Sequence, residues 1–207
     1  MGHATCETRQ KLIDTAQELI WKSSYGSVSV DDICKAADVK KGSFYHFFPS
    51  KVDLALAAME ETVSSHKAEY DKAFSAGTDP VERFERYADL VYQSQKDAQD
   101  ECGHVCGCAL ASLAAEMACQ EERIRQKFDE IISGKKRYFE SALRDMIAEG
   151  TISAKTDVKA KAEEIFSYTI GQLMMARIQN NLEPLKRDLK QGVLNLIGVK
   201  KKASQAA

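Results

Sequence analysis

Helix-breaking residues are scarce in this chain, whose 207 residues include only 3 prolines and 11 glycines. Proline breaks a helix interior and glycine weakens it, so long stretches without either favour long helices. Between the breaks, apolar residues recur at helical spacing, as at Leu12, Ile13, Ala16, Leu19 and Ile20. No alternation of strand and helix patterns interrupts this spacing. The sequence therefore predicts an all-α fold of about nine helices.

The breaks divide the chain into helical segments and three larger parts. Tyr25 and Gly26 end the first segment, with the glycine suited to a positive φ. Helices are expected at about 7–24, 30–37, 41–47, 51–76, 80–99, 109–118, 124–149, 162–179 and 184–197. The first three would form one domain (1–50), the others a second domain (51–199), and 200–207 a flexible tail.

The charge balance excludes one mode of nucleic-acid binding. Lys and Arg number 29 against 31 Asp and Glu, for a formal net charge of -2, so the chain cannot coat nucleic acid by bulk charge. A local basic patch is compatible with this balance. No apolar run approaches the roughly 18–20 residues of a membrane span, so no membrane association is expected. The first residues lack a signal-peptide pattern, which predicts a cytoplasmic protein.

The segment from Ser29 to Lys51 carries the most functional information. Ser29, followed three residues later by Asp32, predicts an N-cap with an acidic residue in the first helical turn. Two short helices joined by a tight turn then make a helix-turn-helix. The small core between the two helices is expected to contain Ile33, Ala36, Ala37, Val39, Phe44 and Phe47, with Cys34 facing the same space.

The outer side of the second short helix would carry hydrogen-bond donors and an aromatic ring. Such groups suit phosphates and the base edges of a major groove, and a glycine among them lets the backbone approach the duplex. The candidate DNA-binding residues are Ser29, Lys40, Lys41, Gly42, Ser43, Tyr45, His46 and Lys51.

Residues 26–54, GSVSVDDICKAADVKKGSFYHFFPSKVDL, resemble the DNA-binding signature of the TetR family of bacterial transcriptional regulators. Gly42, Phe44, Tyr45, Phe48 and Lys51 match the core of the motif. The resemblance implies a helix-turn-helix followed by a helical ligand-binding and dimerisation domain. It also implies that Lys41 and Ser43 lie closest to bases, and that the phosphate contacts come from Ser29, Tyr45, His46 and Lys51.

Three positions depart from the usual family pattern. Cys34 stands where the family usually has alanine, Asp38 where it has a turn glycine, and Lys40 where serine or threonine commonly precedes the reading helix. Aspartate tolerates left-handed backbone better than most residues, so we expect the turn to survive. Lys40 would not supply the usual cap, which would shift the favoured base pairs.

Charge within the DNA-binding segment is nearly balanced. Residues 1–52 hold seven basic and six acidic side chains, a net of +1. We therefore expect modest non-specific affinity per monomer, with useful affinity only when a homodimer binds two half-sites of a palindromic operator.

A second cluster follows the fifth expected helix. Cys102, His104, Cys106 and Cys108 lie within seven residues of each other. Cysteines in a reducing compartment are more often free thiols, metal ligands or redox sensors than disulfides. Packing, thiol sensing and metal binding all remain open here. The spacing is not that of a zinc ribbon, so no metal site is predicted.

The remaining helices suggest two further surfaces. The family resemblance implies a homodimer interface on the last two long helices, with Ile165, Phe166, Thr169, Ile170, Leu173, Arg177, Leu189, Val193 and Leu196 as candidates. The middle helices would enclose an apolar effector pocket. Its candidate lining is Phe84, Tyr87, Tyr92, Met117, Phe128, Phe139 and Met174.

These observations predict a DNA-binding transcriptional regulator rather than an enzyme, without a cofactor. It would be a repressor that leaves its operator when a small molecule binds or when an oxidant or electrophile modifies Cys102, Cys106 or Cys108. The alternative from another class is a helical metal- or redox-binding protein that uses the same cysteine cluster. That alternative lacks a paired base, a nucleophile motif and a phosphate loop.

Overall fold

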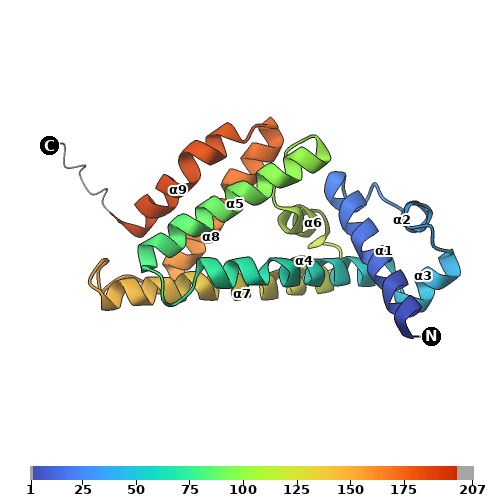
Figure 1. Ribbon diagram of the computed structural model, residues 1–207, viewed down its shortest axis with the longest axis horizontal. Helices are drawn as coiled ribbons and strands as arrows, with labels where there is room; N and C mark the ends of the chain where they lie inside the picture. Colours follow the sequence, from blue (N-terminus) through green and yellow to red (C-terminus); the bar gives the residue numbers. More distant parts are fainter. Residues whose placement is uncertain (1, 200–207) are drawn as a thin grey trace. The chain divides into compact units, whose positions relative to one another are not determined.

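The computed structural model describes residues 2–199, and the predicted tail at 200–207 lies outside them. Nine helices and no strand occur among the described residues, which confirms the all-α prediction (Figure 1). No helix among them is both long and apolar enough to span a bilayer. The helices are α1 (Gly2–Lys22), α2 (Val30–Ala36), α3 (Lys41–Phe47), α4 (Lys51–Ala73), α5 (Pro80–Cys102), α6 (Ala109–Met117), α7 (Glu122–Ala148), α8 (Val158–Gln179) and α9 (Glu183–Ile197).

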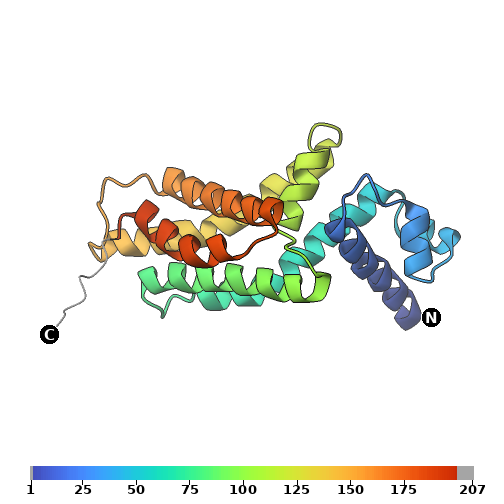
Figure 2. The same ribbon diagram turned by 90° about the horizontal axis from the view of Figure 1, so that it is seen from above.

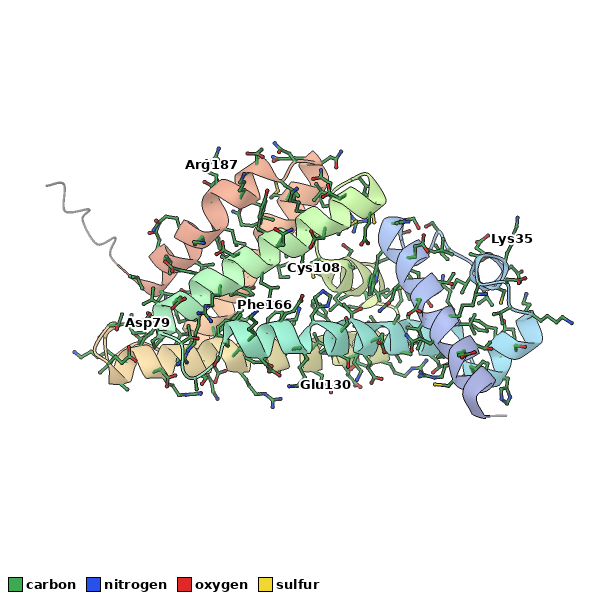
Figure 3. All side chains as sticks on the ribbon, in the orientation of Figure 1. Lys35, Asp79, Cys108, Glu130, Phe166 and Arg187 are labelled. Atoms are coloured by element: carbon green, nitrogen blue, oxygen red, sulfur yellow. The ribbon has the colours of Figure 1, made fainter. Side chains whose placement is uncertain are left out.

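Polar caps set several helix starts. The Asp79 carboxylate accepts hydrogen bonds from the backbone N–H groups of Val81 (2.9 Å) and Glu82 (3.1 Å) and so begins α5 (Figure 3). Asp157 caps α8 in the same way through the N–H of Ala160 (3.0 Å). This cap makes α8 begin four residues before the first buried residue of its apolar pattern, Ala162, because none of the residues of its first turn is buried.

The helices cluster into two compact units. The first comprises the described residues up to Lys67 together with Cys108–Ile131, and the second comprises Ala68–Gly107 together with the described residues from Ile132 onward. The boundary suggested after residue 50 does not coincide with this division. Helix α6 and the first part of α7 belong to the same unit as the helix-turn-helix.

The core of the first unit draws on both of its segments. Leu12, Ile13 and Ile20 of α1 are buried with Phe44 of α3 and residues of α2 and α4. The second segment completes the same cluster, and burying each such side chain contributes about 1.5–3 kcal/mol. That segment is therefore part of what holds the helix-turn-helix together. Its buried members are Leu110 and Leu113 of α6 and Ile124 and Ile131 of α7.

An aromatic cluster forms part of the core of the second unit. Its rings are at T-shaped or tilted angles, with the centroids of Tyr87 and Phe139 4.9 Å apart. Such arrangements are the favoured ones for aromatic pairs. The cluster consists of Tyr70, Phe74, Phe84, Tyr87, Tyr138 and Phe139.

A buried arginine ties the start of α5 to α7 in this unit. Arg83, 4% exposed, donates to the backbone oxygens of Thr78 (2.9 Å) and Ala76 (3.0 Å) and forms an ion pair with Asp145. A buried charge is tolerated only when it is paired and hydrogen-bonded, as it is here.

Helix α9 packs against α8 and α5, as Figures 1 and 2 both show. Gly192 makes the α8–α9 contact possible. A Cβ atom at this position would lie 2.0 Å from Oη and 2.4 Å from Cζ of Tyr168. The bare glycine lets the Tyr168 hydroxyl donate to the backbone oxygen of Asp188 (3.2 Å). The two helices thereby approach more closely than a side chain would allow.

Candidate functional site

The helix-turn-helix is closed by the caps that its sequence predicts. Ser29 Oγ accepts the N–H of Asp32 (3.1 Å), and the Asp32 carboxylate accepts the N–H of Ser29 (2.8 Å), a reciprocal capping box. Hydrogen bonds from Ser29 hold the pKa of Asp32 below its ordinary value. Asp38 adopts φ 51, so the turn survives without glycine, as expected. The N–H of Val39 closes the turn on the oxygen of Cys34 (2.9 Å).

The space between α2 and α3 is filled largely as predicted. Ile33, Ala37 and Phe44 are fully buried, and Cys34 is 7% exposed. Partly buried side chains packed against the same cluster include those of Val39 and Phe47.

One residue assigned to this small core lies outside it. Ala36 is exposed, so the prediction that it is buried there was wrong. Three residues along a helix span less than one turn, which places Ala36 about 60° around α2 from Ile33. That rotation is enough to take its methyl group to solvent.

The outer edge of α3 is exposed. Lys40, Gly42 and His46 are exposed, and Tyr45 retains 48% of its surface. The rings of Tyr45 and Phe44 pack edge-to-face with their centroids 5.1 Å apart. This contact holds the Tyr45 ring in place while the side chain stays accessible to solvent. Lys40 gives α3 no side-chain cap, in line with its departure from the family pattern. Contact of these residues and of the half-buried Ser43 with DNA stays a prediction.

Lys41 is exposed but paired. Its ammonium lies 2.8 Å from the Asp31 carboxylate, which projects from the first turn of α2. The hydrogen bond raises the pKa of Lys41 above its ordinary value. The lysine implied to lie nearest the bases therefore already has an acidic neighbour.

Lys51 occupies a different environment from the open phosphate position that its motif implies. Its ammonium donates to the backbone oxygen of Tyr25 and lies 3.8 Å from the centroid of the Tyr25 ring. Burial lowers the pKa of Lys51, and the nearby Glu116 charge partly offsets that effect. In this structure Lys51 stabilises the turn after α1, and its role in phosphate binding stays a prediction.

Glu116, near the end of α6, is a functional candidate that sequence reasoning missed. Its carboxylate accepts the backbone N–H of Tyr25 (2.9 Å) and of Gly26 (2.6 Å). A Cβ atom on residue 26 would lie 2.8 Å from Glu116 Oε1. Gly26 is not among the glycines with positive φ, so the expected conformational reason was wrong. Glycine makes room here for a carboxylate 90 residues later in the chain.

A second contact joins α4 to the start of α7 within the first unit. Arg123 forms ion pairs with Asp53 (2.8 Å) and Glu121 (3.3 Å). Ser50 Oγ donates to Oδ2 of Asp53 (2.5 Å) and accepts the N–H of the same residue (3.2 Å). The hydrogen bonds from Ser50 and Arg123 hold the pKa of Asp53 below its ordinary value. Polar contacts as well as the core thus tie α6 and α7 to the DNA-binding helices.

The three thiols of the cysteine cluster have different surroundings. Cys102 ends α5 and is half-buried, and Cys106 is 8% exposed. Cys108 is the N-cap of α6, where its Sγ accepts the N–H of Ala111 at 3.4 Å (Figure 3). Among the described residues, no three His, Cys, Asp or Glu side chains are grouped to hold a metal ion. The metal-binding alternative therefore gains no support.

The predicted lining residues divide between the two units of the chain, and their role around an effector stays a prediction. Phe84, Tyr87 and Phe139 are at most 2% exposed and form part of the aromatic cluster, so they pack against each other. Met117 and Phe128 pack instead against the core of the first unit. Aromatic side chains at helical spacing indicate burial, but the pattern does not distinguish a packed core from a pocket wall.

Tyr92 lines a surface pocket of about 270 Å³ in the second unit. Unlike the predicted apolar site, this pocket is mainly polar. Met174 is half-buried on α8 and is not part of its lining. The other lining residues come from the end of α5 and the α8–α9 turn: Lys96, Gln99, Asp100, Asn180, Asn181, Leu182 and Glu183.

Most candidates for the dimer interface belong to the chain's own interior. Side chains buried in one copy are less available to a second copy than half-buried ones, and the predicted interface stays a prediction. Sequence spacing missed Met175 and Ile178, which are 49% and 72% exposed on α8. The candidates that are at most 7% exposed are Ile165, Thr169, Leu173, Leu189 and Val193. The half-buried ones are Phe166, Ile170, Arg177 and Leu196.

A capped helix-turn-helix with an exposed polar edge, built into an all-α chain with a second helical unit, defines a DNA-binding transcriptional regulator. Residues 12–58 match the profile of the bacterial regulatory proteins of the tetR family. Residues 80–191 match the tetracyclin repressor-like C-terminal domain. The chain belongs to the TetR family of transcriptional regulators.

Individual relatives agree with this assignment. The chain is 30% identical to the transcriptional regulator AcuR of Cereibacter sphaeroides, over 85% of this chain and 79% of that protein. It is 24% identical to the transcriptional repressor NemR of Escherichia coli K12, over 90% and 92% of the two chains. A solved TetR regulatory protein from Rhodobacter sphaeroides is 29% identical, with a TM-score of 0.76 over 91% of this chain and 96% of that one.

Proposed function

We propose that the protein is a homodimeric repressor that leaves a palindromic operator when a small-molecule effector binds or a cluster thiol is modified. Its site of action would be the cytoplasm, where bacterial operator DNA lies. The observation that carries the DNA-binding half of this proposal is the exposed α3 edge, positioned by the Ser29 capping box and the Asp38 turn. Relatives named as repressors, NemR of Escherichia coli among them, support the direction of regulation.

Operator binding is tested with a fluorescent duplex from the region upstream of the protein's own gene. We expect Tyr45→Ala combined with Lys40→Ala to weaken binding strongly, because both exposed side chains would lose phosphate contacts. Lys159→Ala, which removes an exposed lysine from α8, serves as the matched control and should bind as the wild type does. Unchanged affinity in a folded double variant would refute the proposed interface.

Salt dependence tests the nearly balanced charge of the same surface. A protein that neutralises few phosphates releases few counterions, so its binding constant falls gently with salt. We expect a shallow slope on non-specific DNA and a steeper one on the palindrome, where two copies bind. A binding constant that falls steeply with salt for a single copy on non-specific DNA would contradict the proposal that useful affinity requires a dimer.

The thiol response is supported by the cluster and by a relative. A solved structure of Escherichia coli NemR is described as its reduced form, which makes thiol state a variable worth testing here. We expect the Cys106→Ser, Cys108→Ser double variant to bind DNA but to remain bound after oxidant treatment. Serine is a good N-cap, so the change at Cys108 preserves the start of α6.

The control for this experiment is Cys119→Ser, which removes an exposed thiol outside the cluster. It should leave DNA on oxidant treatment as the wild type does. A double variant that still releases DNA on oxidation would exclude Cys106 and Cys108 as the responsive thiols.

Dimerisation is assigned to the exposed apolar side chains of α8. Met175 and Ile178 are the large exposed hydrophobic residues there, and their spacing of three places them side by side on the helix surface. We expect Met175→Asp with Ile178→Asp to give a monomer in sedimentation analysis, because burying two carboxylates opposes association. A double variant that sediments as the wild-type dimer would refute this assignment.

A further inference from the structure

The ion pair between Asp31 and Lys41 joins the two helices of the DNA-binding motif on their exposed side. Lys41 is the first residue of α3 and Asp31 lies in the first turn of α2, with Nζ and Oδ1 2.8 Å apart. The side chains of Lys41 and Asp31 are 54% and 70% exposed, respectively. Exposed ion pairs contribute little to stability, so stability alone does not account for this one.

A carboxylate in the first turn of α2 is favoured by the helix dipole, but it meets an unfavourable charge when the motif approaches DNA. Duplex DNA carries one negative charge for each roughly 1.7 Å of its axis, and an acidic side chain beside it is repelled. The neighbouring Asp32 is needed for the capping box with Ser29, but Asp31 has no part in that box. Lys41 cancels the charge of Asp31, which allows the carboxylate to approach the duplex as half of a neutral couple.

The couple lies where a helix-turn-helix meets base edges. In this motif the N-terminal residues of the second helix contact the bases, and Lys41 begins that helix. The ion pair presents a donor, the Lys41 ammonium, next to an acceptor, the Asp31 carboxylate. In the major groove, guanine shows the acceptors N7 and O6, and its paired cytosine shows the donor N4–H₂ beside them. An A·T pair offers no two adjacent acceptors and places a methyl group at the far edge.

We propose that Asp31 and Lys41 together read one G·C pair in each half-site, with Lys41 donating to guanine and Asp31 accepting from cytosine. Asp31 is then a specificity-determining residue that lies outside the reading helix α3. The inference rests on the DNA-binding function and adds to it the identity of one base pair and of the residues that select it.

The test is a selection from a pool of random-sequence duplexes, made in parallel with the full-length wild type and two variants. Asp31→Asn removes the acidic member of the couple. Asp38→Asn is the matched control, because it removes the same charge from the same motif and asparagine also tolerates the φ of 51 found there. Far-ultraviolet circular dichroism establishes that both variants are folded.

We expect the wild type to enrich a palindrome with one strongly preferred G·C pair in each half-site. Asp31→Asn should lose about fivefold of the preference at that single position and keep the others, because the amide oxygen still accepts from cytosine but lacks the charge that strengthens this hydrogen bond and pairs with Lys41. Asp38→Asn should select the wild-type sequence. On random duplex, both variants should bind somewhat more tightly, since each removes one negative charge.

The contrary outcomes distinguish a failure of this inference from a failure of the DNA-binding function on which it rests. A wild type that enriches no sequence would refute sequence-specific DNA binding and the inference with it. A wild type with a clear operator, matched at every position by Asp31→Asn, would overturn the inference alone. So would an equal change in Asp38→Asn, which would reveal a bulk charge effect, or a change confined to an A·T pair.

Discussion

The two hydrogen bonds from the α1–α2 turn to Glu116 should contribute measurably to the stability of the first unit. In Glu116→Ala, the N–H groups of Tyr25 and Gly26, now 2.9 and 2.6 Å from a carboxylate, lose a charged acceptor. A hydrogen bond to a charged group contributes about 1.5–3 kcal/mol. The Gly26 amide is exposed, so water replaces part of that contribution. The expected loss is about 2–3 kcal/mol for the pair.

The single tryptophan makes this loss observable in the relevant unit. Trp21 lies on α1, partly buried against the core of the first unit, so its fluorescence reports the unfolding of that unit. With a urea dependence of about 1–3 kcal/mol/M, the Glu116→Ala midpoint should fall by about 1 M. Glu116→Gln keeps one acceptor oxygen and should fall about half as far.

The matched control is Glu61→Ala on α4 of the same unit. Glu61 is half-buried, as Glu116 is, and its replacement changes the charge and the intrinsic helix propensity by the same amounts. The N–H groups of the α1–α2 turn donate their hydrogen bonds to Glu116 and not to Glu61. We expect its midpoint to stay near that of the wild type. Coincident transitions for Glu61→Ala and Glu116→Ala would refute the reasoning, because they would show that the turn gains nothing from the carboxylate.

Three further predictions concern the packing, titration and capping of particular side chains. Gly192→Ala should lower the thermal midpoint, because its Cβ would overlap the ring of Tyr168 at a cost of about 1–3 kcal/mol; glycine-to-alanine changes inside a helix usually stabilise, so a raised midpoint would contradict the close packing. Burial and the hydrogen bond to Asp71 raise the pKa of Tyr138 to about 12, and the folded state therefore holds this proton more tightly than the unfolded state. The stability that this proton contributes should be full below about pH 10 and be lost between about 10 and 12, and Tyr138→Phe should remove that component from unfolding curves measured across this range. Ser29→Ala should cost about 1 kcal/mol by loss of the cap, measured by urea unfolding, and an unchanged midpoint would show that the capping box is not formed in solution.

Local patterns were sufficient to predict the helices and the geometry of the DNA-binding motif. Each of these features depends only on residues within about four positions of it. Examples are the helix starts at Ser29 and Pro80 and the left-handed turn at Asp38. The chemistry that decides these features acts through neighbouring backbone groups. Its trace is therefore complete within a short stretch of sequence.

Contacts between distant segments could not be predicted in this way. The partner of Gly26 is 90 residues further along the chain, and nothing near residue 26 indicates a carboxylate there. The apolar spacing of α8 shows that Ile165 and Leu173 are buried, but it does not distinguish the chain's own core from a second copy. The motif likewise implied that Lys51 is available to phosphate, while a ring 26 residues earlier occupies its ammonium.

The helix-turn-helix cannot be separated from the rest of the chain by a single cut. Leu110, Leu113 and Ile124 fill its core from a segment that follows α5. A DNA-binding module grafted onto a foreign sensor would need residues 108–131 transferred with it. A hybrid repressor that takes only the first three helices from this chain would leave part of their hydrophobic core exposed. Evolution of a new sensor domain must therefore keep the segment that covers this core.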